Sequence, residues 1–419
     1  MAVFSFFKRL DRRFKVLLAS IGVLSWSSGL SSQYNQLYAT FLGADPINLG
    51  SLESLGGAAS AFFSVPAGWF IDRFGAKKML IFGISLITVT AVIYSCALNW
   101  LMLIPAIVLA RVGMWLIMPL ADMIIVEVTD YGKRSFAISI SRVIWTISSL
   151  FSPFIAAIMI SYSGGMSAEG IRPLYFVQIP ASLLAILLVL AKLEHQPTQK
   201  LPSQQLRKLD LIQSYKQLIE SEKLLKHWMV AIAAMNFWAI SLPYIPLWMV
   251  KVKGADQNIL GLIGTLSILS SLLIMMPIGK LSDTIGCKKV FLLFRSLIYA
   301  GTLLLTWAPN HIILIIAGIL GLTALMGAPG MGGIGGASSI PLITMFFESF
   351  SPEKRGRAQG LVGLLNLISS MAALLGGILW NMGYMEVVLL LPLLTDILIL
   401  VPTIVRLPEK PSDGQSSQH

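Results

Sequence analysis

Long apolar runs that follow one another along the 419-residue chain constrain its fold more than any other feature. Each is long enough for a membrane helix, which needs about 20 residues. Lipid offers the backbone no hydrogen-bonding partner, so the runs must be helices or strands of a closed barrel, and continuous rather than alternating apolarity excludes the barrel. We predict an all-α integral membrane protein with about 12 transmembrane helices. The expected spans are 16–42, 47–71, 79–98, 101–126, 136–160, 173–192, 228–250, 258–280, 290–308, 312–347, 357–382 and 384–406.

The composition agrees with this fold class and argues against a nucleic-acid-binding protein. The chain is 56% hydrophobic and 12% charged, about half the charge of a typical soluble protein. Its formal net charge is +11, but the basic residues sit between apolar runs instead of forming one patch, so we expect no nucleic-acid partner. The run from Val16 to Leu42 is too long for a cleavable signal and is expected to stay as the first membrane helix.

Lysine and arginine are distributed unevenly between the two sides of the membrane. With the N-terminus inside, the outer loops hold only Arg172, Lys251 and Lys253, and the other basic loop residues lie inside. By the positive-inside rule, both termini are predicted to be cytoplasmic. We expect a multi-pass protein of the cell (plasma) membrane, a monomer, in contact with membrane lipid.

One long polar break divides the chain. Within it, apolar residues at helical spacing predict either a helix on the inner membrane surface or a solvated linker. These residues are Leu211, Tyr215, Leu218 and Leu225. The predicted parts are an N-terminal six-helix bundle (1–192), a cytoplasmic central linker (193–227), a C-terminal six-helix bundle (228–406) and a cytoplasmic tail (407–419).

A charged phrase occurs in both halves. "GWFIDRFGAKK" begins at Gly68 and "GKLSDTIGCKK" at Gly279, so the two copies are related by a shift of 211 residues. The later basic loops "YGKRSFA" and "PEKRGRA" are related by a shift of 221, which predicts a ten-residue insertion in or near the glycine run between them. Because each half has an even number of helices, the halves are expected to be parallel repeats.

The phrase resembles the signature loop of the major facilitator superfamily, G-x-x-x-D-[RK]-x-G-[RK]-[RK], although Thr284 stands where the first copy has Arg73. The resemblance covers nearly the whole chain. It implies a secondary transporter in which two bundles rock about one central cavity. It also implies that the two loops latch the halves together on the cytoplasmic side when the transporter opens outward.

The predicted latch has a chemical rationale. Glycine permits a tight loop, and aspartate can accept hydrogen bonds at the N-terminus of a neighbouring helix. The basic residues can bridge to the other half or to anionic lipid. The alternative is a positive loop that only fixes topology, which needs no aspartate. The latch residues are Gly68, Asp72, Arg73, Gly75, Lys77, Lys78, Gly279, Asp283, Gly286, Lys288 and Lys289.

Charged residues within the spans are candidate functional groups, because charge in the bilayer is costly. Glu53 and Arg111 fall at comparable depth and are expected to pair. The resemblance implies a role in proton coupling or solute binding for an arginine in helix 4, although Trp115 stands where the family usually has glycine.

Two further arginines have predicted partners. Arg142 is expected either to pair with Asp122 or Glu127, or to face the cavity and bind an anionic group. Arg295 and Asp396 are expected to form a structural pair or to snorkel towards the interface.

Helices 1 and 7 contain polar and aromatic groups that suit the wall of a wet cavity. The candidates are Gln33, Tyr34 and Asn35 in helix 1 and Asn236 and Trp238 in helix 7. Aromatic residues near a helix end are alternatively an interfacial belt. Residues 330–335 spell G-x-G-x-x-G, but no strand precedes them, so a broken or loosely wound helix 10 is predicted instead of a nucleotide site. Its functional version would be a pliable gate.

The sequence contains no motif typical of an enzyme, a cofactor site or a metal site, so we expect none of these. The predicted function is transport of a small organic solute by alternating access, coupled to protons, as a symporter or as an antiporter for efflux. The coupling candidates are Glu53, Asp122 and Arg111, because a carboxyl group in a low-dielectric medium can exchange a proton near neutral pH. The alternative is a receptor or scaffold of the same fold that transports nothing.

Overall fold

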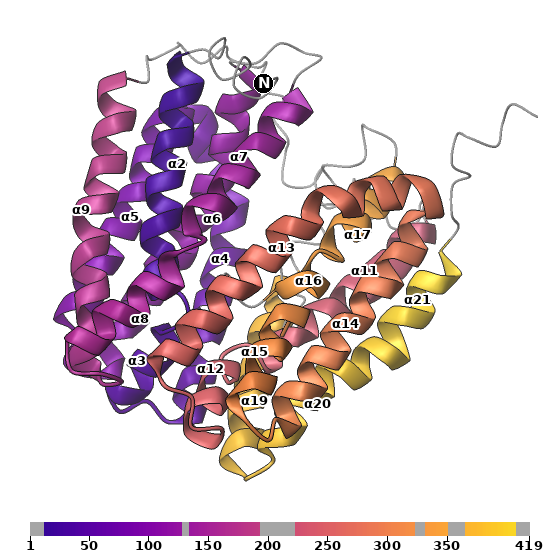
Figure 1. Cartoon of the computed structure of the whole chain (residues 1–419). Helices are drawn as coiled ribbons and strands as arrows, with labels where there is room; N and C mark the ends of the chain where they lie inside the picture. Colours follow the sequence, from indigo (N-terminus) through magenta and orange to yellow (C-terminus); the bar gives the residue numbers. More distant parts are fainter. Residues whose placement is uncertain (1–11, 128–133, 193–222, 323–331, 351–364, 408–419) are drawn as a thin grey trace, which may run out of the picture. The chain divides into compact units, whose positions relative to one another are not determined.

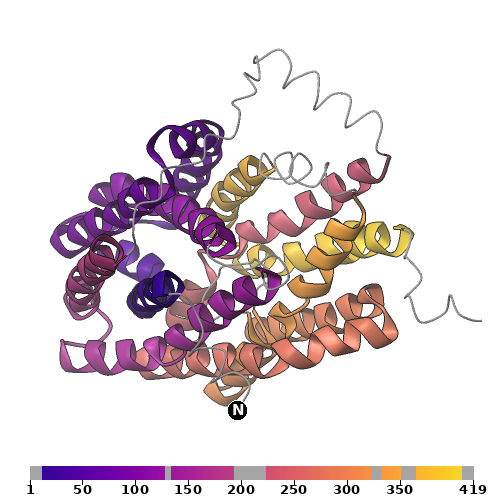
Figure 2. The same ribbon diagram turned by 90° about the horizontal axis from the view of Figure 1, so that it is seen from above.

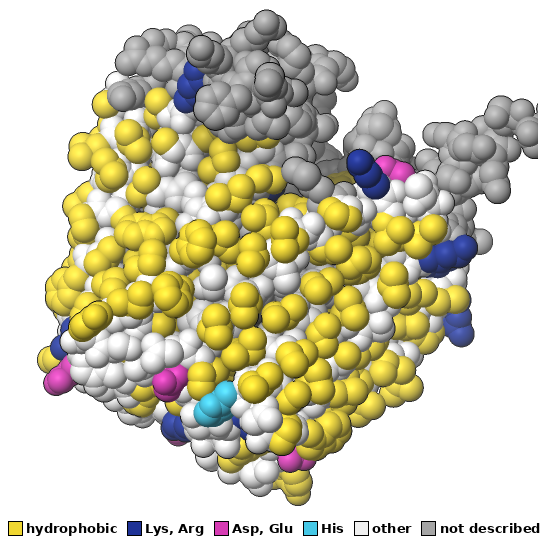
Figure 3. Space-filling model, in the orientation of Figure 1, with side chains coloured by type: hydrophobic (Ala, Val, Ile, Leu, Met, Phe, Trp, Pro, Cys, Tyr) yellow, Lys and Arg dark blue, Asp and Glu magenta, His cyan; other side chains and the backbone are white. Residues whose placement is uncertain are grey.

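The computed structural model describes residues 12–127, 134–192, 223–322, 332–350 and 365–407, and the regular elements among these residues are all helical. Nine stretches in the described part of the chain are long and apolar enough to cross a membrane. Hydrophobic side chains cover the middle of the face drawn in Figure 3, and charged side chains lie near its two ends. The predicted all-α membrane fold is therefore confirmed, while the number of spans and the side of each terminus stay predictions.

The helices group into two compact units (Figures 1 and 2). The first unit comprises residues 1–44 and 55–201. Its elements are α2 (Arg12–Ser31), α3 (Asn35–Phe41), the larger part of α4 (Pro46–Phe74), α5 (Ala76–Cys96), η1 (Trp100–Met102), α6 (Leu103–Glu127), α7 (Arg134–Ser149), α8 (Ser152–Tyr162) and α9 (Ala168–Lys192). Apolar side chains of α2, α5, α6 and α9, such as Leu17, Ile84, Leu120 and Val189, form its core.

The second unit comprises residues 45–54 and 202–419. Its elements are α11 (Lys223–Asn236), η3 (Phe237–Ile240), α12 (Ile245–Leu247), η4 (Trp248–Val252), α13 (Gln257–Ile285), α14 (Cys287–Trp307), α15 (His311–Leu320), α16 (Gly333–Gly336), α17 (Ser339–Glu348), α19 (Asn366–Asn381), α20 (Met385–Thr395), η5 (Asp396–Leu400) and α21 (Val401–Arg406). Trp228, Phe291 and Phe346 lie in its main core. Leu225 also lies in this core, because α11 begins inside the predicted linker. The other residues of the predicted surface helix lie outside the described residues.

The internal repeat extends well beyond the charged phrase. A shift of 211 residues carries α4 onto α13, both of 29 residues, and α5 onto α14, both of 21 residues. The same shift relates two N-caps: Asn99 accepts from the amide of Met102 and Asn310 accepts from the amide of Ile313. Capping by asparagine satisfies an amide that the first helical turn leaves open. The two halves therefore share local structure that the phrase alone did not reveal.

Glycine is required at one position of each phrase by the backbone itself. Gly75 has φ 84° and ψ 153°, and Gly286 has φ 92° and ψ 143°. Other residues rarely enter this region of backbone conformation. Each of these glycines ends one long helix and begins the next, so the tight inter-helix turn predicted for the phrase is present in both units.

The first ten residues after Ala44 pack with the second unit, although they precede most of the first. The hydroxyl of Tyr244 lies 3.1 Å from the carbonyl oxygen of Pro46 and 2.9 Å from that of Ala373, so it can donate to either. The ring of Tyr244 stacks on Trp380 with 5.4 Å between centroids. A Cβ atom on Gly50 would lie 2.7 Å from the Tyr244 hydroxyl, so the absence of a side chain there permits this close packing.

Helix 10 is broken, as the sequence predicts. Its first part, α15, ends at Gly321 with φ 119°, and the chain continues after the undescribed residues 323–331 at Gly333 with φ 52°. Two serines of α13 hold the second part: Ser267 accepts from the amide of Gly333 at 2.8 Å, and Ser271 donates to the carbonyl oxygen of Gly333 at 2.6 Å. The interruption is thus fixed by side-chain hydrogen bonds. Its role as a pliable gate stays a prediction.

Candidate functional site

Helices α6 and α7 bring Asp122 and Arg142 together in the first unit. Nη2 of Arg142 lies 2.6 Å from Oδ2 of Asp122, and Nη1 lies 2.9 Å from the sulfur of Met118, one turn earlier on α6. Of the partners that the sequence left open for Arg142, the structure shows Asp122.

The Asp122–Arg142 pair is partly exposed rather than buried. The exposed fraction is 29% for the Asp122 side chain and 43% for the Arg142 side chain. Both residues fall within candidate membrane spans, near the ends where α6 stops and α7 starts. Because charge exposed to hydrocarbon is costly, a half-exposed ion pair at this depth is expected to line a water-filled space. The pair is the strongest candidate site for a polar solute.

Arg111 lies farther along α6, and a glycine makes room for it. A Cβ atom on Gly56 of α4 would lie 2.9 Å from Cγ of Arg111 and 2.6 Å from Cγ2 of Ile107. The long side chain therefore passes over α4 at a position without a side chain. Glu53 belongs to the segment grouped with the second unit, so its predicted pairing with Arg111 stays a prediction.

The polar residues of helix 1 pack inside the first unit. Gln33 and Tyr34 are buried, and Asn35 accepts a hydrogen bond from the hydroxyl of Tyr175 at 2.8 Å. The ring of Tyr175 in turn packs against Tyr94, 4.6 Å between centroids. The Asn35–Tyr175 bond connects helix 1 to α9, and the contact of Gln33, Tyr34 and Asn35 with a solute stays a prediction.

A buried polar cluster in the second unit connects helices 7, 9 and 12. Arg295 forms an ion pair with Asp396, and both side chains are almost completely buried. Trp238 of η3 donates its indole N–H to Oδ2 of Asp396 at 3.0 Å, and the hydroxyl of Tyr299 lies 3.4 Å from the same oxygen. The predicted pair is confirmed. The alternative, that Arg295 snorkels, is wrong because only 2% of its side chain is exposed.

Asn236, Tyr244 and Trp248 of helix 7 are also buried. The indole N–H of Trp248 donates to the carbonyl oxygen of Leu305 at 3.2 Å. The sequence left Trp238 either on a cavity wall or in the interfacial belt; in the structure its indole N–H is bound to Asp396, and a contact with a solute stays a prediction. The signal that could have found this contact is the costly intramembrane aspartate, because a buried carboxylate takes hydrogen-bond donors from the side chains around it.

In each charged phrase, the first lysine of the pair binds the end of the last helix of its own half. Nζ of Lys77 lies 3.3 Å from the carbonyl oxygen of Leu190 on α9. Nζ of Lys288 lies 3.0 Å from the carbonyl oxygen of Val405 and 2.6 Å from that of Leu407, at the end of α21. A cation at a helix C-terminus satisfies open carbonyl groups and interacts favourably with the helix dipole. Sequence reasoning had considered only the other half and lipid as partners.

The surroundings of the other latch residues are only partly described. The surroundings of Gly68 and the side chain of Asp72 fall outside the described set, and Asp283, Lys78 and Lys289 are exposed. The guanidinium of Arg73 lies over the ring of Phe74, 5.6 Å from its centroid. A Cβ atom on Gly279 would meet nothing within 4 Å. A latch between the halves stays a prediction.

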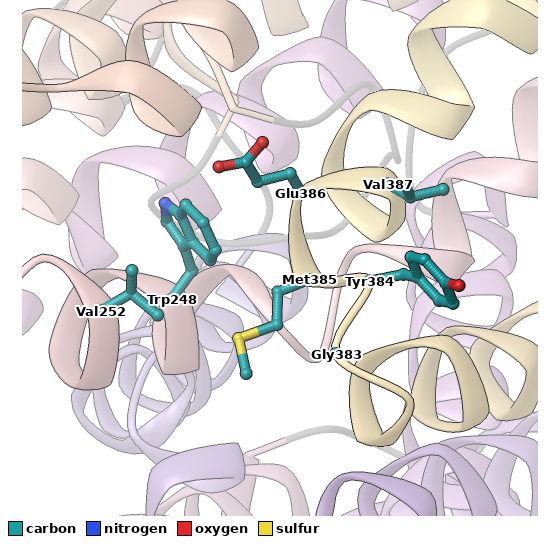
Figure 4. A pocket seen from close by; sticks show the side chains of 7 residues that line it. All are labelled: Trp248, Val252, Gly383, Tyr384, Met385, Glu386 and Val387. Atoms are coloured by element: carbon teal, nitrogen blue, oxygen red, sulfur yellow. The ribbon is translucent and has the colours of Figure 1, made fainter.

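A shallow cavity of about 330 Å³ lies in the second unit between the end of helix 7 and the loop before α20. Figure 4 shows Trp248, Met385 and Glu386 pointing towards the same space, and Tyr384 pointing away. It contains none of the residues predicted as solute or coupling sites. Across the residues that the structure describes, no three His, Cys, Asp or Glu side chains are grouped to hold a metal ion.

Comparison with known protein families identifies the family of this chain. The model of the Major Facilitator Superfamily matches the sequence twice, over residues 16–256 and 227–419. The chain belongs to the major facilitator superfamily. A search of curated protein sequences found no match.

Solved structures of other transporters share the superfamily fold. A mutant of the nucleoside transporter NupG is similar with a TM-score of 0.73 and 15% identity, covering 93% of this chain and 99% of that one. A POT family transporter in complex with 5-aminolevulinic acid has a TM-score of 0.69 and 15% identity, with coverages of 94% and 97%. A D-xylose-proton symporter has a TM-score of 0.66 and 14% identity, with coverages of 95% and 98%. At this identity the likeness establishes the fold alone.

Proposed function

We propose that the protein is a secondary transporter that moves a small organic solute across the cell membrane by alternating access. Membership of the major facilitator superfamily supports this proposal, as do similar structures of transporters for nucleosides, for peptides and for xylose with protons. The observation that carries it is the half-exposed Asp122–Arg142 pair within the membrane spans. The structural Arg295–Asp396 pair, which lies nearer the middle of its spans, is by contrast closed off.

The proposed mechanism is a rocker switch. The two bundles alternate between an outward and an inward opening, and the charged loops at Asp72 and Asp283 hold the inner side closed in the outward-open state. The solute binds in the water-filled space beside Asp122 and Arg142. Energy comes from a proton gradient, with Glu53, Asp122 and Arg111 as the groups that couple proton and solute movement. Either symport or antiport is compatible with this scheme.

Reconstitution tests the proposal directly. The purified protein is placed in liposomes that contain a pH-sensitive dye, and nucleosides, dipeptides, amino acids and aldoses are added in turn. We expect at least one solute class to produce proton movement and accumulation driven by a pH gradient. Asp122→Asn should abolish the signal, while Glu169→Gln, at an exposed position in the first turn of α9, should retain it. Solute binding without flux under any gradient would instead favour a receptor.

A further inference from the structure

The Asp122–Arg142 pair offers both signs of charge to one accessible space. Its two charged groups touch through a single pair of atoms, Nη2 and Oδ2, at 2.6 Å. The other oxygen of Asp122 makes no hydrogen bond that we find to a described residue. The pair is neutral as a whole, yet each partner retains capacity for a further contact.

The second contact of Arg142 is weak. Nη1 points at the sulfur of Met118 at 2.9 Å, and a thioether is a poor hydrogen-bond acceptor. A guanidinium group has five N–H donors and binds carboxylates best through two parallel bonds. A solute carboxylate that displaced the sulfur would therefore replace a weak bond by charge-assisted ones at little cost.

The electrostatics of the site select the charge of its ligand. A solute with one negative charge would engage Arg142 but leave the site, between membrane spans, with a net charge of about −1, which is unfavourable. A solute with one positive charge would engage Asp122 but leave the site with a net charge of about +1, which is also unfavourable. A solute that carries both charges can pair each one and leave the site neutral. Neither protein residue is then left as an unpaired charge.

We propose that the solute is a small zwitterion. Its anionic group binds Arg142, its ammonium group binds Asp122, and the ion pair opens to admit it. The two solute charges must be close together, as in an amino acid or a short peptide-like compound, because the protein charges are adjacent. No proton transfer is required for this step. The inference rests on the proposed function, since it places Asp122 and Arg142 in the path of the solute.

The test uses three probes that share one side chain and differ in charge: zwitterionic leucine, anionic N-acetyl-leucine and cationic leucine methyl ester. The dipeptide leucyl-leucine serves as a longer zwitterion. Binding to the purified full-length protein is measured by calorimetry. Wild-type protein should bind a zwitterion about tenfold or more tightly than either capped form. Asp122→Asn should shift the preference towards N-acetyl-leucine, and Arg142→Gln should shift it towards the methyl ester.

A charge-swapped variant distinguishes a loss of charge pairing from misfolding of the single variants. Asp122→Arg combined with Arg142→Asp restores a neutral pair in reverse and should again favour the zwitterion over both capped forms. The proposal is overturned if no zwitterion binds wild-type protein, if the probes bind equally, or if both single variants shift the preference in the same direction. Transport of an aldose or nucleoside without zwitterion binding would defeat this inference alone. Zwitterion binding without flux would defeat the proposed function and leave the site intact.

Discussion

Nζ of Lys288 donates to the carbonyl oxygen of Leu407 at 2.6 Å, at the end of the last described helix. Its repeat partner Lys77 makes the corresponding contact with Leu190. In both halves, the loop between the second and third helix is therefore tied to the point where the bundle's final helix ends. A motif read as a connection between the halves also holds each half together.

The lysine contact gives a first prediction. Lys288→Met should lower the free energy of unfolding by about 0.5–1 kcal/mol, because the carbonyl groups at the end of α21 lose their cation. Lys289→Met is the matched control, since Lys289 is exposed. Denaturation of the detergent-solubilised protein measures both. Equal effects of the two substitutions would argue against a capping role.

The buried cluster gives a second prediction. Asp396→Asn or Arg295→Gln alone should destabilise the protein by about 3–5 kcal/mol, because each leaves an unpaired buried charge. The double variant Arg295→Met with Asp396→Leu should recover most of the loss. Thermal unfolding followed by intrinsic fluorescence distinguishes these cases. If the double variant is as unstable as the sum of the singles, the pair is not the source of the effect.

The glycine turns give a third. Gly75→Ala and Gly286→Ala force alanine into a conformation that glycine alone adopts readily, which costs about 1–3 kcal/mol. Gly279→Ala is the contrasting case, because it lies inside α13 with nothing within 4 Å of the new Cβ atom. It should stabilise the helix by about 0.5–1 kcal/mol. The free energy of unfolding should fall in the two turn variants and rise in the Gly279 variant, and a change of the same sign in all three would contradict the backbone argument.

The helix-10 break gives a fourth. Ser267→Ala leaves the buried amide of Gly333 without its acceptor and should cost about 1–3 kcal/mol. Ser296→Ala is a suitable control, because its hydroxyl is exposed and bonds only to a carbonyl of its own helix. Hydrogen exchange at Gly333 should accelerate in the first variant and stay unchanged in the second. Unchanged exchange in both would show that other contacts hold the break.

Proton coupling gives the fifth. Glu53→Gln should abolish accumulation driven by a pH gradient but retain exchange of labelled for unlabelled solute, because exchange needs no net proton movement. Uptake by proteoliposomes measures both activities, with Glu169→Gln as the control. Normal pH dependence in the Glu53 variant would remove this residue from the coupling candidates.

The sequence predicted the general architecture because lipid leaves few choices to a long apolar run. It also predicted the Arg295–Asp396 pair and the Asp122–Arg142 pair as alternatives among others, since intramembrane charges need partners, and the structure shows both. It did not predict that Trp238 binds Asp396, because the 3₁₀ turn at Trp238 and the π-helix that begins at Asp396 alter the register of both helices. Nor did it identify the acceptors of Lys77 and Lys288, because backbone carbonyl groups carry no sequence signature.

The buried ion pair has a consequence for how the chain enters the membrane. Arg295 precedes Asp396 by 101 residues. At about 5–20 residues per second, ribosomal synthesis of the intervening segment takes on the order of 5–20 s. During that interval, Arg295 in the middle of helix α14 has no aspartate partner, and its placement in lipid costs about 2.5–3.5 kcal/mol. Helix α14 is therefore expected to wait beside the insertion machinery, or in a shallow position, until the final span is made.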